Sequence, residues 1–383
     1  MRARRARRHP GGHPGVTALS TTVARLFGKF AAEVPGAPQA QFTFAPTTAE
    51  DAAAILDFAS EHSMSVVPWG GGTHQVGPPY EPDIVVSTRN LTGIDFRPDD
   101  LTVVVGAGVP VVELEAVLAE RGQTAVLPEN PGAATVGGVV AAGASGWRRL
   151  RYGPTRDRLL EVIVATGDGR VIRGGGQVVK NVTGYDLPRL FTGSLGSLGM
   201  VTRMCIKLWP QGATAATVAV DDVERALALA YRPLAVLQTR DGVSVYLAGT
   251  AAEVEAQSIA LGGAASPGLH WPQRPEGTVA ITLRVSPALM TDAVRRVSAS
   301  GEFVAAHGVG EVLVAGSFTE DAVSEWRSWA ESVSGAVVVT AAPVGFSLDP
   351  WGKPPETLVL QRRIKSAFDP LGVMVPGRLP GGV

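Results

Sequence analysis

The residues best suited to chemistry are glycines that follow a predicted strand. Residues 68–74 have the sequence Pro-Trp-Gly-Gly-Gly-Thr-His. Three glycines in a row allow backbone N–H groups to approach an anion with no Cβ in the way, and the Thr73 hydroxyl adds a donor. The segment predicts a loop that cradles a phosphate or pyrophosphate. Taken alone, the same composition also fits an ordinary flexible loop.

Two more clusters of small residues follow this loop. Residues 128–153 contain repeated Gly-Gly and Ser-Gly pairs, which indicates that a flat ligand such as an isoalloxazine ring approaches the backbone; tight packing of a helix on a strand is the alternative. Residues 180–202 carry glycines at 193, 196 and 199 and end in a predicted strand. Neither the Rossmann glycine fingerprint nor the P-loop pattern occurs in the chain, which disfavours the common nucleotide-binding folds.

Composition excludes several classes of protein. At 383 residues the chain suits two domains, and its formal net charge of -1 creates no general attraction to nucleic acid or to an anionic membrane. The one cysteine, Cys205, excludes an internal disulfide framework and a cysteine-rich metal or iron–sulfur site, and we expect it to be a small core residue. No run of eighteen apolar residues predicts a membrane span.

The first residues are basic. Residues 1–8 include five arginines, but the segment that follows lacks a continuous apolar region, so it is a poor signal peptide. We expect a disordered extension, with a basic arm for nucleic acid or lipid as the alternative. A cytoplasmic location is expected, with peripheral attachment to a membrane only through partners.

Hydrophobic periodicity predicts the elements that must position the glycine clusters. Up to Pro210 the pattern predicts two helices and several short strands, namely helices over 48–62 and 111–121, strands over 64–69, 84–87, 101–106 and 200–208, and a hairpin over 159–173 that turns at Gly167-Asp168-Gly169. Residues 214–344 read as an α/β module with antiparallel strands and helices on one face. Residues 361–380 are amphipathic and then proline-rich. The expected fold class is α+β.

In their order and spacing, the three clusters resemble the two-lobed, PCMH-type FAD-binding domain of the vanillyl-alcohol-oxidase family. The resemblance covers residues 46–210 and Pro376-Gly377-Arg378. Within the family, the sequences at 148–153, 174–186 and 193–196 are most similar to the FAD-binding subunits of bacterial glycolate oxidases. The resemblance implies four parts: a poorly ordered extension (1–44), the FAD-binding domain (45–211), an α/β cap domain for substrate (212–345) and a C-terminal segment that returns to the FAD-binding domain (346–383).

The resemblance also implies the cofactor and its residues. The loop of residues 69–75 wraps the pyrophosphate of FAD, residues 135–138 and 144–146 line the flavin, the Val201 backbone meets the adenine half, and Arg378 returns from the tail. In full, the expected FAD-binding residues are Pro68, Trp69, Gly70, Gly71, Gly72, Thr73, His74, Gln75, Pro131, Thr135, Gly137, Gly138, Ala144, Ser145, Gly146, Tyr152, Gly153, Gly196, Gly199, Val201 and Arg378. Some relatives attach the flavin to a histidine, but here Thr73 intervenes before His74, so we expect non-covalent FAD.

Three residues are candidates for substrate chemistry. Arg284 occupies the place where relatives that act on 2-hydroxy acids carry an arginine for the carboxylate; an exposed strand arginine is the alternative. His307 resembles part of a metal and base constellation, whose other members are replaced by Gly308-Val309-Gly310-Glu311. Lys180 would stabilise negative charge on the reduced flavin, unless it is a solvated hairpin lysine. No metal site is predicted.

The resemblance implies an FAD-dependent oxidoreductase acting on CH–OH groups. The expected reaction is oxidation of a 2-hydroxy acid such as glycolate to glyoxylate, in a complex with a catalytic flavoprotein subunit and an iron–sulfur subunit. A stand-alone FAD-dependent oxidase or dehydrogenase acting on another alcohol is the second hypothesis. The third is a scaffold that keeps the fold without binding flavin.

Overall fold

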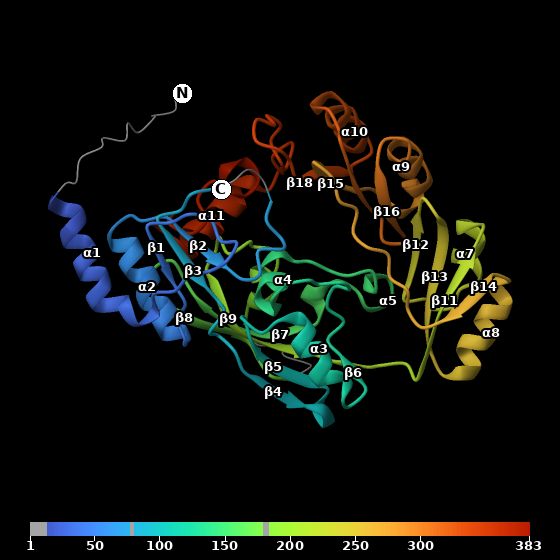
Figure 1. Cartoon of the computed structure of the whole chain (residues 1–383), viewed down its shortest axis with the longest axis horizontal. Helices are drawn as coiled ribbons and strands as arrows, with labels where there is room; N and C mark the ends of the chain where they lie inside the picture. Colours follow the sequence, from blue (N-terminus) through green and yellow to red (C-terminus); the bar gives the residue numbers. More distant parts are fainter. Residues whose placement is uncertain (1–13, 77–79, 179–183) are drawn as a thin grey trace.

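The computed structural model describes residues 14–76, 80–178 and 184–383. Figure 1 shows two bodies joined by a narrow waist, with the amino-terminal body on one side and an eight-stranded sheet on the other. We call residues 42–210 the first lobe and residues 214–341 the cap. Helices and sheets are segregated within each body, so the predicted α+β class is confirmed.

The first lobe begins with a small parallel sheet in the order β1-β3-β2. Helix α2 packs beside this sheet; the Thr48 side chain caps it by accepting a hydrogen bond from the Asp51 N–H at 3.0 Å. The apolar side chains of α2 that were predicted from helical spacing are buried. The elements are β1 (Phe42–Phe44), α2 (Ala49–Glu61), β2 (Val66–Trp69) and β3 (Ile84–Ser87).

The expectation of a poorly ordered extension up to residue 44 is wrong from residue 14 onward. Residues 14–27 form helix α1 (Pro14–Phe27), followed by a short 3-10 turn. Val23 and Phe27 are buried in the same core as α2, and the Phe27 ring lies 5.4 Å from that of Phe58. The prediction failed because these aromatic contacts join residues about thirty positions apart, which local patterning does not reveal.

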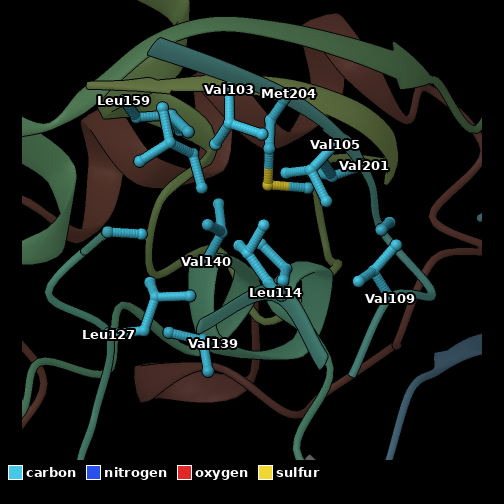
Figure 2. Close-up of a cluster of buried hydrophobic side chains, with 14 of the residues drawn as sticks. Val103, Val105, Val109, Leu114, Leu127, Val139, Val140, Leu159, Val201 and Met204 are labelled. Atoms are coloured by element: carbon cyan, nitrogen blue, oxygen red, sulfur yellow. The ribbon is translucent and has the colours of Figure 1, made fainter. Parts of the chain in front are cut away.

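The second half of the first lobe is a five-stranded antiparallel sheet in the order β4-β5-β9-β7-β8. Helices α3 and α4 cover one face of this sheet, and the valines and leucines between them form a continuous core (Figure 2). The hairpin predicted at Gly167–Gly169 joins β7 to β8. The elements are β4 (Ile94–Arg97), β5 (Thr102–Gly106), α3 (Val111–Ala119), β6 (Gln123–Thr124), α4 (Val136–Ala142), α5 (Arg149–Tyr152), β7 (Leu159–Ala165), β8 (Val171–Gly175), α6 (Leu187–Phe191), β9 (Met200–Lys207) and β10 (Trp209–Pro210).

The cap is an antiparallel sheet in the order β14-β11-β13-β12-β16-β17-β15-β18. The helices of the cap pack on one face of this sheet (Figure 1), and the other face contacts the first lobe through Trp147 and, in α5, Tyr152. The elements are β11 (Thr214–Val220), α7 (Val223–Leu229), β12 (Ala235–Thr239), β13 (Gly242–Gly249), α8 (Ala251–Leu261), β14 (Ala264–Pro267), β15 (Val279–Arg284), α9 (Met290–Val297), β16 (Glu302–His307), β17 (Glu311–Gly316), α10 (Glu320–Ser332) and β18 (Ala336–Ala341).

The C-terminal segment returns to the first lobe through helix α11 (Leu358–Phe368). The buried Lys365 ammonium donates to the Ser197 carbonyl at 2.7 Å, to the Met374 carbonyl at 2.5 Å and to the Asp369 carboxylate at 2.7 Å. Asp369 also accepts the N–H groups of residues 373 and 374. Residues 373–375 then run alongside β2, with hydrogen bonds to Val66 on both sides. Every donor of the ammonium is therefore satisfied.

Replacing Lys365 should destabilise the protein, because it leaves the Asp369 carboxylate buried without its cation. We expect Lys365→Met to lower the free energy of unfolding by about 3–5 kcal/mol, measured by urea denaturation followed by tryptophan fluorescence. Lys353→Met removes an exposed lysine from the same segment and should change stability by less than about 0.5 kcal/mol. Equal effects of the two substitutions would contradict the assignment.

Candidate functional site

A cavity of about 690 Å³ lies where the first lobe, the tail and the cap meet. Its walls include the loop after β2, one side of α4, the C-terminal end of β18 and the tail near Arg378. Its volume falls within the range of small-molecule pockets, about 300–1,000 Å³. The predicted residues on its walls are Pro68, Trp69, Gly70, Gly71, Gly72, Thr73, His74, Gln75, Gly138 and Arg378.

The glycine loop after β2 is held by backbone contacts with residues 133–135. A Cβ on Gly71 would collide with the Ala133 carbonyl, and one on Gly70 would collide with the Thr135 hydroxyl. Gly72 has φ of +72° and lies against the Trp69 ring, a conformation that favours glycine. The glycines thus serve first to bring the loop against its neighbour, and this packing leaves the loop facing the cavity.

Helix α4 forms the second wall. Thr135 caps it by accepting a hydrogen bond from the Gly138 N–H at 3.2 Å. Val139 and Val140 point into the core of the first lobe (Figure 2), while the opposite side carries only small residues towards the cavity, Gly138, Ala141 and Ala142. One side of α4 is therefore packed in the core, and the other side, made of small residues, lines the cavity.

The end of α4 is held by the next glycine cluster. The N–H groups of Gly193 and Leu195 donate to the carbonyls of Val140 at 3.0 Å and Ala141 at 2.7 Å. Leu195 has φ of +52° and lines the cavity. A left-handed leucine is uncommon and costs free energy. The surrounding turn, with glycines at positive φ on both sides, fixes it there.

FAD fits these walls. A Cβ on Gly138 would meet a single atom within 4 Å, the Thr135 hydroxyl at 3.2 Å, so the space beyond Gly138 belongs to the cavity. A wall without side chains suits a flat ring or an extended ribityl chain. Arg378 adds a positive charge suited to a pyrophosphate; its guanidinium donates to the Val76 carbonyl at 2.5 Å.

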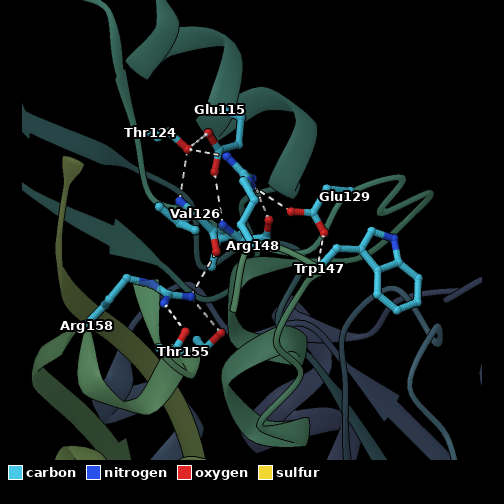
Figure 3. Close-up of polar contacts among 10 residues, drawn as sticks. Glu115, Thr124, Val126, Glu129, Trp147, Arg148, Thr155 and Arg158 are labelled. Atoms are coloured by element: carbon cyan, nitrogen blue, oxygen red, sulfur yellow. Dashed lines mark hydrogen bonds and ion pairs between the residues drawn. The ribbon is translucent and has the colours of Figure 1, made fainter. Parts of the chain in front are cut away.

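The remaining predicted FAD-binding residues lie outside the walls of this cavity. Gly153 lies beside the polar network of Figure 3, in which Arg148 pairs with the buried Glu129 at 2.6 Å and Arg158 donates to the Val126 carbonyl; Arg158 also donates to the Gly153 carbonyl. Burial, and next the charge of Arg148, lower the pKa of Arg158 to about 10. The network holds the chain behind α4. The residues that the structure places outside the walls are Pro131, Thr135, Gly137, Ala144, Ser145, Gly146, Tyr152, Gly153, Gly196, Gly199 and Val201.

Several of these residues have a visible packing role. Ser145 accepts the Thr155 N–H at 3.0 Å, and a Cβ on Gly146 would collide with Glu129. Tyr152 packs on Trp209, with ring centroids 5.3 Å apart, and the side chain of Val201 is buried in the core. They support the walls of the cavity from behind.

Sequence reasoning missed other residues of the walls. Ala141 and Ala142 follow Gly138 at helical spacing, and that signal was available. The rest come from segments that meet only in the folded chain, namely residues 36–39, Val67, Val76, Tyr80, Glu81, Leu195, residues 340–342 and Val375. No local pattern marks them.

Arg284 and His307, two of the three candidates for substrate chemistry, do not line the cavity. Arg284 is paired with Glu311 at 2.9 Å and lies at one end of β15, whereas the cavity adjoins the other end, where Ala280 pairs with Ala341. His307 is buried, its Nε2 lies 2.9 Å from the Gln238 side chain, and burial lowers its pKa. Lys180 lies outside the described residues.

The described residues contain no group of three metal-ligating side chains that could hold an ion. Within the same ranges, the helices are too short or too polar to cross a bilayer. Burial raises the pKa of Cys205 to about 11, as expected of a core thiol.

Comparison with known proteins finds a match to an FAD-binding domain in part of the chain. A family described as "FAD binding domain" matches residues 40–175. The D-lactate dehydrogenase of Archaeoglobus fulgidus is 40% identical over 182 residues, which are 46% of this chain and 41% of that protein. The glycolate oxidase subunit GlcE of Escherichia coli is 42% identical over 122 residues, or 31% of this chain and 34% of that protein.

The chain therefore contains a domain that is similar to FAD-binding domains. Its cofactor is FAD. The glycolate oxidase subunit GlcD of Bacillus subtilis is 37% identical over 182 residues, 45% of this chain and 38% of that subunit. The chain thus spans about two fifths or less of these relatives, and the similarity concerns the FAD-binding part.

A solved structure shares the fold of nearly the whole chain. Alkyldihydroxyacetonephosphate synthase superposes with a TM-score of 0.64 at 15% identity, covering 89% of this chain and 77% of that one. The likeness extends over the first lobe and the cap, so the combination of an FAD-binding lobe with an antiparallel cap is a shared architecture.

Filling the cavity from α4 should abolish FAD binding while the protein still folds. Gly138→Leu places a side chain in the cavity, and leucine has the higher helix propensity by about 1 kcal/mol. We expect the Kd for FAD, measured by fluorescence titration, to rise by at least about tenfold, which corresponds to 1.4 kcal/mol. Ala256→Leu, on the exposed side of α8, is the matched control. Unchanged FAD affinity of folded Gly138→Leu would place the flavin elsewhere.

Proposed function

We propose that this chain is the FAD-binding subunit of a complex that oxidises a small 2-hydroxy acid, such as glycolate to glyoxylate, and passes the electrons to a partner. The proposal rests on the cavity between the first lobe and the cap. Its wall on α4 consists of small residues that leave room for FAD, and the end of β18 also lines it. FAD accepts the hydride equivalent in such reactions. We further propose that FAD is held without a covalent bond.

The titratable groups on the described walls favour dependence on a partner. Oxidation at C2 requires a base that takes the hydroxyl proton, a contribution of roughly 10²–10⁴ in rate. Burial, and next the charge of Arg274, lower the pKa of His74 to about 4, so it is a weak base at neutral pH. Burial raises the pKa of Tyr80, which therefore stays protonated. Arg378 is a cation, and Glu81 is an exposed residue on the same walls.

Two relatives support the choice of partners. Both are subunits of glycolate oxidase. If this chain holds FAD beside a second, catalytic flavoprotein subunit, that second subunit would supply the missing base. An iron–sulfur subunit would accept the electrons, since Cys205 alone cannot ligate a cluster in this chain.

A stand-alone dehydrogenase is the second candidate, and the 40% identity with a D-lactate dehydrogenase favours it. In that case the base would come from this chain itself, and the 2-hydroxy acid would reduce the flavin without a partner. The two candidates therefore differ in a single measurable property.

The rate of flavin reduction separates them. The purified, FAD-loaded chain is mixed anaerobically with glycolate or D-lactate, and the oxidised flavin absorbance is followed. The assay is then repeated with the chain isolated from its own cells together with the proteins that bind it. We expect reduction at least about 10²-fold slower in the isolated chain, because the general base is absent. Rapid reduction by the chain alone would establish the stand-alone enzyme. No reduction in either preparation would refute both acids as substrates.

A further inference from the structure

The segment between β18 and α11, residues 342–357, runs from the cap to the first lobe (Figure 1). Its first part packs on the cap. The side chains of Phe346 and Leu348 lie against the hydrophobic core of the cap, and the Ser347 N–H donates to the Glu320 carboxylate of α10 at 2.6 Å. These residues are therefore structurally part of the cap.

The chain then turns beside β18, where three hydrogen bonds hold it. The Pro350 carbonyl accepts the N–H of Val339 at 2.8 Å, and the Asp349 carbonyl accepts the Arg327 guanidinium at 2.9 Å. The Asp349 carboxylate accepts the N–H of Trp351 at 2.8 Å. The backbone at Trp351 is thus fixed to the cap sheet and to α10.

The side chain of Trp351 reaches from the cap to the wall of the cavity. Its indole Nε1–H donates to the Arg378 carbonyl at 2.9 Å. Arg378 lines the cavity, and its guanidinium donates to the Val76 carbonyl at 2.5 Å and lies over the Tyr80 ring, 5.7 Å from the ring centroid. Trp351 itself is partly exposed and lies outside the cavity walls. It therefore meets the site at Arg378.

An arginine binds an anion best when its position is fixed beforehand, because ordering a flexible side chain on binding costs conformational entropy. The residue before Arg378 is Gly377, which has φ of +73°. Glycine moves readily between backbone conformations, so this turn needs an outside contact to hold it. The hydrogen bond from Trp351 supplies that contact immediately after the turn.

We propose that Trp351 is a positioning residue, which fixes Arg378 for a phosphate of FAD and thereby links the FAD site to the cap. A guanidinium binds a phosphate through two parallel hydrogen bonds, whose geometry requires a fixed arginine. FAD binding and attachment of the cap then favour each other, because both depend on the same hydrogen bond. The inference concerns FAD alone and is independent of the substrate in the proposed function.

The FAD affinity of single and double variants tests the proposal. Trp351→Phe keeps an aromatic ring and removes the N–H donor. We expect the Kd of the full-length apoprotein for FAD, measured by fluorescence titration, to rise by about 2- to 10-fold, the usual net effect of losing one hydrogen bond. In the Arg378→Gln background the same substitution should have no further effect, because Trp351 acts through Arg378. Trp329→Phe, at a partly exposed position of α10, is the matched control and should leave the Kd unchanged.

Hydrogen–deuterium exchange adds a readout that a purely structural role would not change. FAD should slow exchange at the amides of Val339, Trp351 and Gly352 in the wild-type protein but not in Trp351→Phe, although these three residues lie outside the cavity walls. An unchanged Kd, an equal loss in both backgrounds, or protection that persists without the indole N–H would overturn the proposal. If Arg378→Gln itself leaves FAD affinity unchanged, Arg378 does not contact FAD and the proposal fails with it.

Discussion

The close approach of two backbones, the glycine loop at 70–72 and the segment at 133–135, is the constraint on which the cavity depends. No side chain fits at Gly71, because the Ala133 carbonyl occupies that position. Thr135 lies in the same contact and caps α4. One contact therefore sets the position of the loop after β2 and of the helix that forms the facing wall. Because glycines leave this contact without side chains, there is room for a ligand beside the loop.

A second constraint brings the tail to this cavity. The Lys365–Asp369 pair is buried and fully hydrogen-bonded, and it joins α11 to the loop at Ser197 and to residues 373–375. Burial lowers the pKa of Lys365, and the hydrogen bond that Lys365 donates to Asp369 acts in the opposite direction. From this attachment the chain continues to Arg378 on the cavity wall. The cap supplies the last wall through residues 340–342.

Local patterns predicted much of the fold. Turn and periodicity rules predict the helix that begins at Thr48, the hairpin at Gly167–Gly169 and the helices of the cap domain. All of these elements are present. Helix α1 was missed because its burial depends on Phe44 and Phe58, far along the chain.

The site was predicted only in part, for a similar reason. Glycines of two kinds look alike in sequence: Gly138 opens onto the cavity, whereas Gly146 and Gly199 pack against other parts of the protein. Arg284 matched a family position, but its pairing with Glu311 across the sheet becomes visible only with the register of β15 and β17.

Hydrogen–deuterium exchange with and without FAD tests the central claim, that FAD lies between the glycine loop, α4 and the tail. Backbone amides of residues 70–76, 138–142 and 376–378 should exchange more slowly when FAD is bound, because the ligand covers them. A second cavity of about 550 Å³ lies between the N-terminus of α2 and strands β4, β5 and β9, and it should be unaffected. Protection confined to that second cavity, or equal exchange everywhere, would contradict the account.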